Sequence, residues 1–406
     1  MNPQRFLRLV SGAMAALGIS AAAIVALNLR GEDPLPSAET LKPTPALVAQ
    51  GEYLTRVGNC MACHTVQGGA PFAGGRGIET PFGVVYSSNL TPDKATGLGA
   101  WTSAEFWRAM HNGRGKDGRL LYPAFPYTSY THVTREDSDA IFAYLQSLPP
   151  VAQANKAHAL RFPYSTQAAL GVWRALFFTP ADAAQPAPPA PQALATAQVP
   201  DYQRGAYLVN GLGHCAACHT PRNSLGAEQQ GQALAGGLIP VQNWLAPALT
   251  DAGQAGVQRW PQADVVALLK TGVAPQASVI GPMAEVVFRS TQYLSDADAR
   301  AMAVYLQALP QHAATPAKQA VAPASVMERG AKVYEAQCAQ CHGAQGQGAK
   351  DEAGQPAFPP LAGNRAVVLA DPTNLVRVVL QGGYLPATAG NPRPHGMPPF
   401  QHLLGD

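Results

Sequence analysis

Three short runs of the chain contain all six of its cysteines. They are Cys60-Met61-Ala62-Cys63-His64, Cys215-Ala216-Ala217-Cys218-His219 and Cys338-Ala339-Gln340-Cys341-His342. In each run two residues separate the thiols, so both sulfurs can reach one edge of a porphyrin, and the adjacent histidine can bind the metal beneath it. This spacing predicts a haem attached by two thioether bonds. We therefore expect three covalently bound haem c groups.

The predicted cofactor-binding residues follow from these runs. They are Cys60, Cys63 and His64, Cys215, Cys218 and His219, and Cys338, Cys341 and His342. The three histidines are the expected proximal iron ligands. A single run of this kind could also be half of a zinc site or a redox-active dithiol. Three copies, each with its own histidine and with no cysteine left over, argue against both alternatives.

The sixth iron ligand is expected to be methionine in two of the three sites. A methionine thioether raises the reduction potential and suits electron transfer. Met283 lies 68 residues after Cys215, and Met397 lies 59 residues after Cys338, both in proline-containing loops. We expect these two methionines to bind iron. Of the others, Met1 and Met14 lie in the N-terminal apolar segment, Met61 lies inside a haem motif, Met302 lies on the apolar face of a helix, and Met327 is expected just before the first helix of its domain.

The first site departs from this pattern. The residue at the matching distance is Phe125, which cannot bind iron. Met110 is nearby but lies in a predicted helix, where core packing is the usual role of methionine. His111 and His132 could bind iron, although a single histidine near a loop usually faces solvent. The first haem is therefore predicted to be either five-coordinate or ligated by another residue.

The N-terminal segment, residues 1–40, indicates where the protein is located. Arg5 and Arg8 precede an apolar stretch over residues 9–29. About 20 residues at about 1.5 Å per residue span a hydrocarbon core of about 30 Å. The two arginines favour an N-terminus inside the cell. We predict an uncleaved anchor in the cytoplasmic membrane with the haem domains in the periplasm; a cleaved signal peptide is the alternative, and it leads to the same compartment.

Internal repeats predict a mainly α fold with three tandem cytochrome c-like domains behind an N-terminal transmembrane helix. A helix that starts with a glycine is expected before each motif, at Gly51, Gly205 and Gly330. Closing helices are predicted to begin after Thr134 and Ser295, which have the side chains of N-caps. Thr102 and Glu105 form a predicted capping box for a further helix.

The expected boundaries follow from these repeats and from two Ala- and Pro-rich stretches. They are the membrane anchor or signal segment 1–40, domain 1 with a C-terminal extension 44–179, a linker 180–200, domain 2 201–310, a linker 311–324, and domain 3 325–406. Domain 3 reaches residue 406 without a counterpart of the closing helix. We expect its C-terminus to be truncated in this sequence.

Composition excludes some functional classes. The net charge is +3 and only 13% of residues are charged, without the clustered Lys and Arg that nucleic-acid binding requires. The chain also has no Gly-x-Gly-x-x-Gly fingerprint that opens a βαβ unit for binding a dinucleotide. Catalytic residues are therefore not assigned.

The motifs together resemble a known family, the three-haem cytochrome subunits of bacterial membrane-bound alcohol, gluconate, fructose and aldehyde dehydrogenases. Besides the three haem motifs, the resemblance rests on Phe-Ala-Gly-Gly at 72–75, Thr-Pro-Phe-Gly at 80–83, Ser-Asn-Leu-Thr-Pro-Asp at 88–93, Leu-Tyr-Pro-Ala at 121–124, Phe-Pro-Tyr at 162–164, Trp-Arg-Ala-Leu-Phe-Phe at 173–178 and Gly-Pro-Met-Ala-Glu-Val-Val at 281–287. It covers nearly the whole chain.

The resemblance implies that a separate subunit oxidises the substrate and that electrons pass through the haems to membrane quinone or a terminal oxidase. The run Pro-Ala-Phe-Pro-Tyr at 123–127 is more similar to cytochromes that accompany molybdenum-containing aldehyde or nicotinate-type dehydrogenases. A flavin- or PQQ-dependent partner is the alternative. The aromatic run at 173–178 could contact lipid or a partner subunit, or pack on domain 1.

Two other functional classes remain open. One is a haem peroxidase that works at an open first haem. The other is a soluble electron shuttle without a fixed partner.

Overall fold

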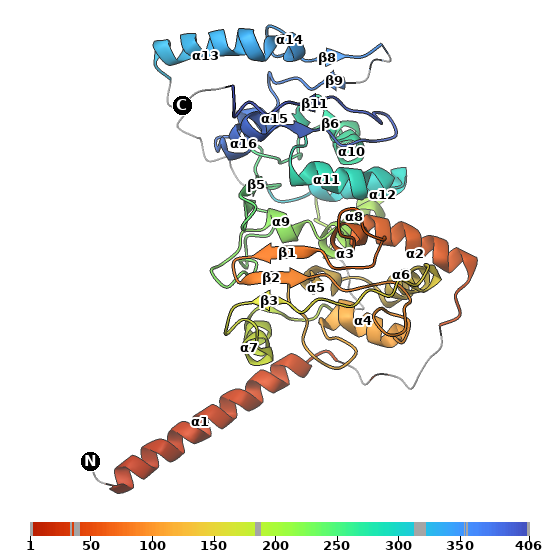
Figure 1. The fold of residues 1–406 in the computed structure, drawn as a ribbon, viewed down its shortest axis with the longest axis vertical. Coiled ribbons are helices and arrows are strands. Elements are labelled where there is room, and N and C mark those ends of the chain that lie inside the picture. Colours follow the sequence, from red (N-terminus) through yellow and green to blue (C-terminus); the bar gives the residue numbers. More distant parts are fainter. Residues whose placement is uncertain are drawn as a thin grey trace. The chain divides into compact units, whose positions relative to one another are not determined.

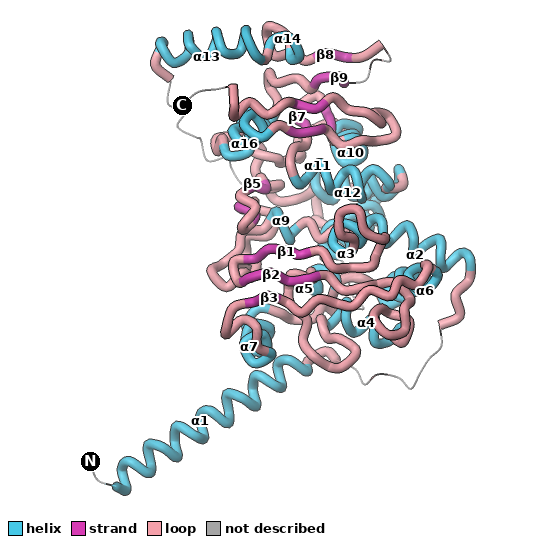
Figure 2. The backbone as a smooth tube through the Cα atoms, viewed as in Figure 1, coloured by secondary structure: helices cyan, strands magenta, loops and turns pink. Residues whose placement is uncertain are grey.

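The structure, a computed structural model, describes residues 3–32, 35, 41–182, 188–311, 322–352, 354 and 356–403 (Figure 1). The chain forms two compact units. The first contains most residues up to 186 together with the loop 223–227, and the second contains residues 55–62 and most residues from 187 onward. The described residues are mainly helical, as predicted, and the strands are short (Figure 2).

The elements that precede the first linker include the long N-terminal helix and those of the first haem motif. They are α1 (Pro3–Leu29), α2 (Pro45–Val57), α3 (Cys60–His64), β1 (Gly77–Thr80), β2 (Gly83–Tyr86), α4 (Ser103–Asn112), α5 (Tyr127–Tyr130), α6 (Arg135–Ser147), β3 (Ala159–Leu160) and α7 (Gln167–Phe177). The three strands form an antiparallel sheet in the order β1-β2-β3.

The elements around the second haem motif repeat part of this order. They are η1 (Thr196–Gln198), α8 (Val199–Tyr207), η2 (Leu208–Leu212), α9 (Ala216–His219), β4 (Gly237–Ile239), β5 (Trp244–Ala246), α10 (Gln262–Thr271), β6 (Val273–Ala274), β7 (Ala277–Ser278), α11 (Pro282–Arg289), η3 (Thr291–Tyr293) and α12 (Asp296–Gln307). Two antiparallel strand pairs, β4-β5 and β6-β7, lie between the helices.

The elements around the third haem motif complete the described chain. They are α13 (Ala324–Gln337), α14 (Ala339–His342), β8 (Ala349–Lys350), β9 (Pro356–Phe358), α15 (Arg365–Val368), α16 (Thr373–Gln381), β10 (Gly383–Tyr384) and β11 (Gly396–Met397). Here the antiparallel pairs are β8-β9 and β10-β11.

The predicted caps of three helices are confirmed. Thr102 and Glu105 form a capping box at the start of α4. The backbone N–H of Asp137 donates to Thr134 Oγ1 at the start of α6, and the N–H of Asp298 donates to Ser295 Oγ at the start of α12. The side-chain oxygens bind N–H groups that a helix leaves without partners in its first turn.

Glycines allow two pairs of helices to approach closely. A Cβ atom added at Gly51 in α2 would lie 1.9 Å from the carbonyl oxygen of Ala140 in α6. A Cβ atom added at Gly205 in α8 would lie 2.0 Å from the carbonyl oxygen of Ala301 in α12. The prediction that these glycines start their helices is wrong, because the helices begin several residues earlier. Each glycine lies where the backbone of a closing helix passes.

The third repeat differs at the equivalent glycine. Gly330 lies in the middle of α13, and a Cβ atom there would meet no atom within 4 Å. Within the part of the chain that the structure describes, no residue of α13 is buried. Met327 lies inside this helix and is 63% exposed, so its predicted position before the helix is wrong.

The linkers also differ from their predicted extent. The segment 180–200 is not extended to its end, because η1 occupies Thr196–Gln198 and α8 begins at Val199. Residues 183–187 and most of the second linker, 312–321, lie outside the described residues. The third repeat begins with α13 at Ala324.

Two buried asparagines join the second and third repeats within the second unit. The backbone N–H of Leu245 donates to Asn374 Oδ1 over 2.8 Å, and Asn374 Nδ2 donates to the carbonyl of Leu245 over 2.7 Å. Asn364 Nδ2 donates to Ser278 Oγ over 3.0 Å. The side chain of Asn374 thus hydrogen-bonds both backbone groups of Leu245 in β5, as a residue of a neighbouring strand would. These bonds connect the third repeat to the second.

Candidate haem-binding sites

Each haem motif folds into a short helix. The three helices are α3, α9 and α14, and Cys215 and Cys338 are the N-cap residues of the last two. Residues three positions apart lie on one side of a helix. The two thiols of each motif are therefore on the same side, as attachment to one edge of a porphyrin requires.

The histidine ring of each motif is oriented by a backbone carbonyl. His64 Nδ1 lies 2.7 Å from the carbonyl oxygen of Ser88. His219 Nδ1 lies 2.7 Å from that of Pro247, and His342 Nδ1 lies 3.0 Å from that of Pro359. A carbonyl only accepts hydrogen bonds, so Nδ1 carries the proton and donates. The lone pair is then on Nε2, where an iron atom can bind it.

Burial keeps two of these rings neutral. It lowers the pKa of His64 and of His219, while the hydrogen bond to the carbonyl raises it by a smaller amount. A neutral imidazole is the form that binds iron. The donor set of two thiols and one neutral imidazole therefore fits a haem c in both sites.

In each repeat, a glycine with positive φ lies between the haem motif and the segment whose carbonyl accepts the hydrogen bond from the histidine. The N–H groups of Gly74, Gly236 and Gly348 donate to the carbonyl oxygens of His64, His219 and His342, respectively, over 2.7–2.8 Å. Their φ angles are +74°, +81° and +73°. A Cβ atom at any of the three would lie within 2.7 Å of backbone in or next to the segment that supplies the carbonyl to the histidine. Only glycine combines this φ with this approach.

A leucine completes the same backbone arrangement in all three repeats. The N–H of Leu90 donates to the carbonyl of Phe72, that of Leu249 to Leu234, and that of Leu361 to Gly346. Each leucine lies two residues after the carbonyl that binds the histidine. Sequence reasoning missed this shared feature. Its signal is a Gly that a Leu follows 16 residues later in the first repeat and 13 residues later in the second and third, and the longer first loop conceals the repeat.

The surroundings of the second motif favour the neutral form of its two thiols. Burial raises the pKa of Cys215 to about 12 and also raises the pKa of Cys218. Zinc binding and dithiol exchange both use the thiolate form. Among the described residues, no three His, Cys, Asp or Glu side chains gather into a site for a bare metal ion. The neutral thiols are compatible with thioether attachment.

The distal positions of the first two repeats are equivalent in the structure. After α4 the N–H of Leu121 donates to the carbonyl of Gly113, and after α10 the N–H of Val279 donates to the carbonyl of Gly272, both over 2.8 Å. Phe125 is the fourth residue after Leu121. Met283 is likewise the fourth residue after Val279. The hydrogen-bond register thus places Phe125 where the second repeat has Met283.

The two predicted distal methionines lie in different local structures. Met283 is half-buried in the first turn of α11, where it packs against a cluster that contains Val279 and Val287. Met397 is half-buried in β11 and pairs with Gly383 of β10. In that register Met397 corresponds to Ser278 of β7, which pairs with Val273. Ser278 lies five residues before Met283. The methionine of the third repeat therefore lies in the strand pair, at a position that precedes the one Met283 occupies in the second repeat.

The other candidate ligands of the first haem are buried or half-buried. Met110 is buried, and Ser138 Oγ lies 4.0 Å from its sulfur, in agreement with core packing. His111 is buried and stacks on Trp107 with ring centroids 4.5 Å apart. His132 is half-buried, and this burial lowers its pKa. The expectation that such a histidine faces solvent is wrong for His111, whereas His132 is partly exposed.

Comparison with known proteins gives consistent results. The profile of the family "Cytochrome c" matches residues 48–149, 202–310 and 327–406. The chain is 39% identical to the alcohol dehydrogenase (quinone) cytochrome c subunit of Gluconacetobacter polyoxogenes, over 90% of this chain and 79% of that relative. It is 39% identical to the gluconate 2-dehydrogenase cytochrome c subunit of Pantoea cypripedii (89% and 82%). It is 40% identical to a nicotinate dehydrogenase subunit of Pseudomonas putida, over 89% of this chain and 29% of that relative.

Three helical repeats, each with a thiol pair and a carbonyl-oriented histidine, define a multihaem c-type cytochrome, whose class function is electron transfer. The chain belongs to the cytochrome c family, and its three matched segments correspond to three covalently bound haem c groups.

Proposed function

We propose that this protein passes single electrons from a separate dehydrogenase subunit through its three haems to membrane quinone or a terminal oxidase. A bound haem c supplies the one-electron chemistry. Cys60, Cys63, Cys215, Cys218, Cys338 and Cys341 attach the haems in this proposal, and His64, His219 and His342 bind iron. Met283 and Met397 are the proposed distal ligands of the second and third haems.

The observation that carries the proposal is the repeated arrangement around the three histidines. Each imidazole donates from Nδ1 to a carbonyl within 3.0 Å, and the backbone carbonyl of each histidine accepts a hydrogen bond from a glycine N–H. Fixed rings limit the reorganisation that accompanies electron transfer. The relatives named above are cytochrome subunits or larger subunits of dehydrogenases, which supports a dehydrogenase as the partner.

For the type of partner we propose a molybdenum-containing aldehyde or nicotinate-type dehydrogenase. The Pro-Ala-Phe-Pro-Tyr run supports it, as does the similarity to a subunit of a nicotinate dehydrogenase. A flavin- or PQQ-dependent dehydrogenase is the alternative, because relatives of the alcohol and gluconate kinds are equally similar.

We further propose that α1 anchors the chain in the cytoplasmic membrane, with the haem domains in the periplasm. Leu9–Leu29 is long and apolar enough to cross a bilayer, and the most apolar part of this stretch is exposed. Covalent haem attachment to such motifs takes place in the periplasm of bacteria.

A second candidate function rests on Phe125. Phe125 occupies the position in the first repeat that Met283 occupies in the second. The first haem would therefore lack a distal methionine and could react with peroxide. Cyanide distinguishes the two functions. A cyanide-induced shift of the ferric spectrum together with peroxide turnover would favour a peroxidase, and a spectrum that cyanide leaves unchanged would exclude it.

The proposed function is tested by purifying the tagged full-length chain from detergent-solubilised membranes. We expect a large subunit to co-purify, and metal and cofactor analysis of that subunit identifies its type. Its substrate should reduce the haems in a stopped-flow experiment when both subunits are present, and should not reduce the isolated chain. Reduction of the isolated chain by the substrate would contradict the proposal.

A further inference from the structure

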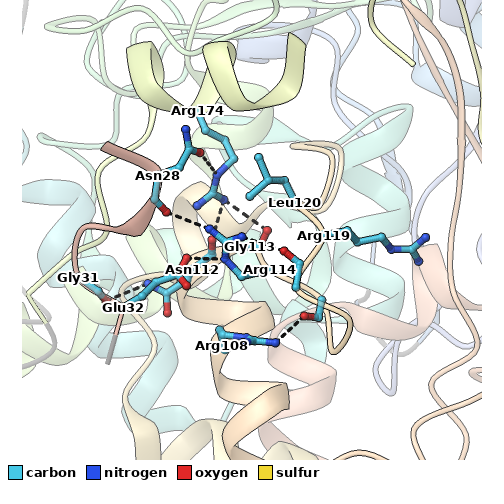
Figure 3. A network of polar contacts seen from close by, with 12 residues as sticks. Asn28, Gly31, Glu32, Arg108, Asn112, Gly113, Arg114, Arg119, Leu120 and Arg174 are labelled. Atoms are coloured by element: carbon cyan, nitrogen blue, oxygen red, sulfur yellow. Dashed lines mark hydrogen bonds and ion pairs between the residues drawn. The ribbon is translucent and has the colours of Figure 1, made fainter. Parts of the chain in front are cut away.

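The last turn of α1 is bonded to the first haem domain rather than joined to it by a loose tether (Figure 3). Asn28 is 9% exposed, although it lies in an apolar helix. Its Nδ2 donates to the carbonyl of Gly171 in α7 over 2.8 Å. Its Oδ1 accepts from Arg174 Nε over 3.0 Å. The end of the helix is therefore attached directly to α7.

A second set of bonds holds two of the residues that follow α1. Asn112 Nδ2 donates to the carbonyl of Gly31 over 3.0 Å. Arg114 Nε forms an ion pair with Glu32 Oε1 at 2.7 Å, and both side chains are mostly buried. Arg174 also donates to the carbonyl of Asn112, which joins the two sets (Figure 3). Several bonds from separate elements fix the direction in which α1 leaves the domain.

The contact with α7 lies close to the end of the apolar span. A Cβ atom at Gly171 would lie 3.9 Å from the side chains of both Ile24 and Asn28. Ile24 precedes Leu29, the last residue of the span, by five positions. At about 1.5 Å per residue, α7 therefore contacts α1 about 7 Å inside that end. Helices that lie in a membrane interface bury their apolar face about 5–10 Å into it.

The outer face of α7 has the composition that such a position requires. Ala168, Val172 and Leu176 recur every four residues and are exposed, Leu176 by 61%. The one charged residue of α7, Arg174, is 3% exposed and points to the network around Asn28. Just before the helix, Phe162 is 84% exposed. An uncharged face with an exposed aromatic residue is costly in water and is favoured at the bilayer boundary.

We propose that the outer face of α7, together with Phe162, lies in the interfacial layer of the bilayer beside α1, so that the first haem domain rests on the membrane in one fixed orientation. This inference rests on the proposed anchoring by α1. The bilayer is favoured over a partner subunit as the occupant, because α7 itself contacts the membrane-spanning helix through Gly171, which lies against Ile24 and Asn28.

The experiment places a photoreactive amino acid, p-benzoylphenylalanine, at one position at a time in the full-length chain in its native membranes. The test positions are Phe162 and Leu176. Leu17 inside the apolar span is the positive control, and Phe288 of α11, which is 43% exposed on the second unit, is the matched negative control. After irradiation, the adducts are identified by mass as phospholipid or protein.

We expect phospholipid adducts from positions 162, 176 and 17, and none from position 288. Phospholipid adducts from position 17 alone would overturn the inference and leave the anchor intact. Protein adducts at 162 and 176 would overturn it in favour of a partner subunit. Recovery of the chain in the soluble fraction, with no lipid adduct at 17, would overturn both the anchor and the inference.

Discussion

The properties of each haem site depend on single residues that differ between otherwise equivalent backbones. All three sites have the same histidine–carbonyl bond and the same glycine with positive φ. They differ on the distal side, where Phe125 occupies the register position of Met283. An aromatic side chain in that position offers no lone pair to iron. The first haem is therefore expected to differ from the second in potential and in access to external ligands.

Replacing Phe125 by methionine tests this difference. A thioether ligand raises the potential of a haem, so in the F125M variant the first haem should titrate at higher potential. A shift of the order of 100 mV lies well within the roughly 0.8 V range that axial ligands span. Potentiometric titration followed by optical absorption measures it.

Leucine at the same position is the control for Phe125→Met. The F125L variant also removes the ring but supplies no ligand, so its potentials should stay close to those of the parent protein. An equal shift in both variants would show that packing, and not iron ligation, sets the potential of the first haem.

Pairs of crossing helices position the motifs, and the closeness of the crossing depends on glycine. In the second repeat α8 and α12 approach so closely at Gly205 that a Cβ atom would overlap the carbonyl of Ala301. A bidentate ion pair between Arg204 and Asp298, with distances of 2.8 Å, lies beside this crossing. η2, which follows α8 and precedes Cys215, also contacts α12, because Asn210 Nδ2 donates to the Tyr305 hydroxyl over 3.0 Å.

Gly205→Ala should destabilise the second repeat. Overpacking of a close contact costs about 1–3 kcal/mol, and here the opposing atoms are backbone and cannot rotate away. Thermal unfolding followed by circular dichroism measures the loss.

The third repeat offers a matched control. Gly330→Ala is also a glycine-to-alanine change inside a helix, but nothing lies within 4 Å of the new Cβ atom. It should stabilise α13 by up to about 1 kcal/mol through helix propensity alone. Equal effects of the two substitutions would contradict the role assigned to Gly205.

Sequence patterns predicted much of this organisation. The haem motifs, the caps at Thr102, Thr134 and Ser295, and the apolar helix all appear where the spacing places them. The starts of the helices were predicted less well, because Gly51 and Gly205 mark crossings with residues about 90 positions away and not helix ends. The carbonyl partners of the histidines were missed because any residue type can supply a backbone carbonyl. Their identity depends on tertiary structure.

In the proposed function electrons pass from repeat to repeat, so the contacts that set the haem spacing matter as much as the sites. In the second unit, Asn374 binds both backbone groups of Leu245, and Asn364 binds Ser278. Amide side chains that replace a missing strand partner satisfy buried backbone groups that would otherwise be costly. We expect these two asparagines to hold the second and third haems at a constant distance.

Asn374→Ala should loosen this connection. It removes two hydrogen bonds from the buried side chain, at about 1 kcal/mol each. The backbone N–H of Leu245 should then exchange with deuterium faster, by roughly one to two orders of magnitude, since about 1.4 kcal/mol corresponds to tenfold. Mass spectrometry of the peptide that contains Leu245 measures the rate.

Asn391 is the matched control for this change, because its hydrogen bonds in the structure come from its backbone. Asn391→Ala should leave exchange at Leu245 unchanged. Unchanged exchange in the Asn374 variant as well would mean that the side chain does not hold the two repeats together.

The most direct test of the proposed haem ligation is near-infrared magnetic circular dichroism of the purified ferric protein, combined with a count of covalently bound haem. We expect three haems per chain, with methionine-ligated signals from two of them. Met283→Leu and Met397→Leu should each remove one of these signals. Methionine-ligated signals from all three haems, or from none, would contradict the assignment of these two ligands.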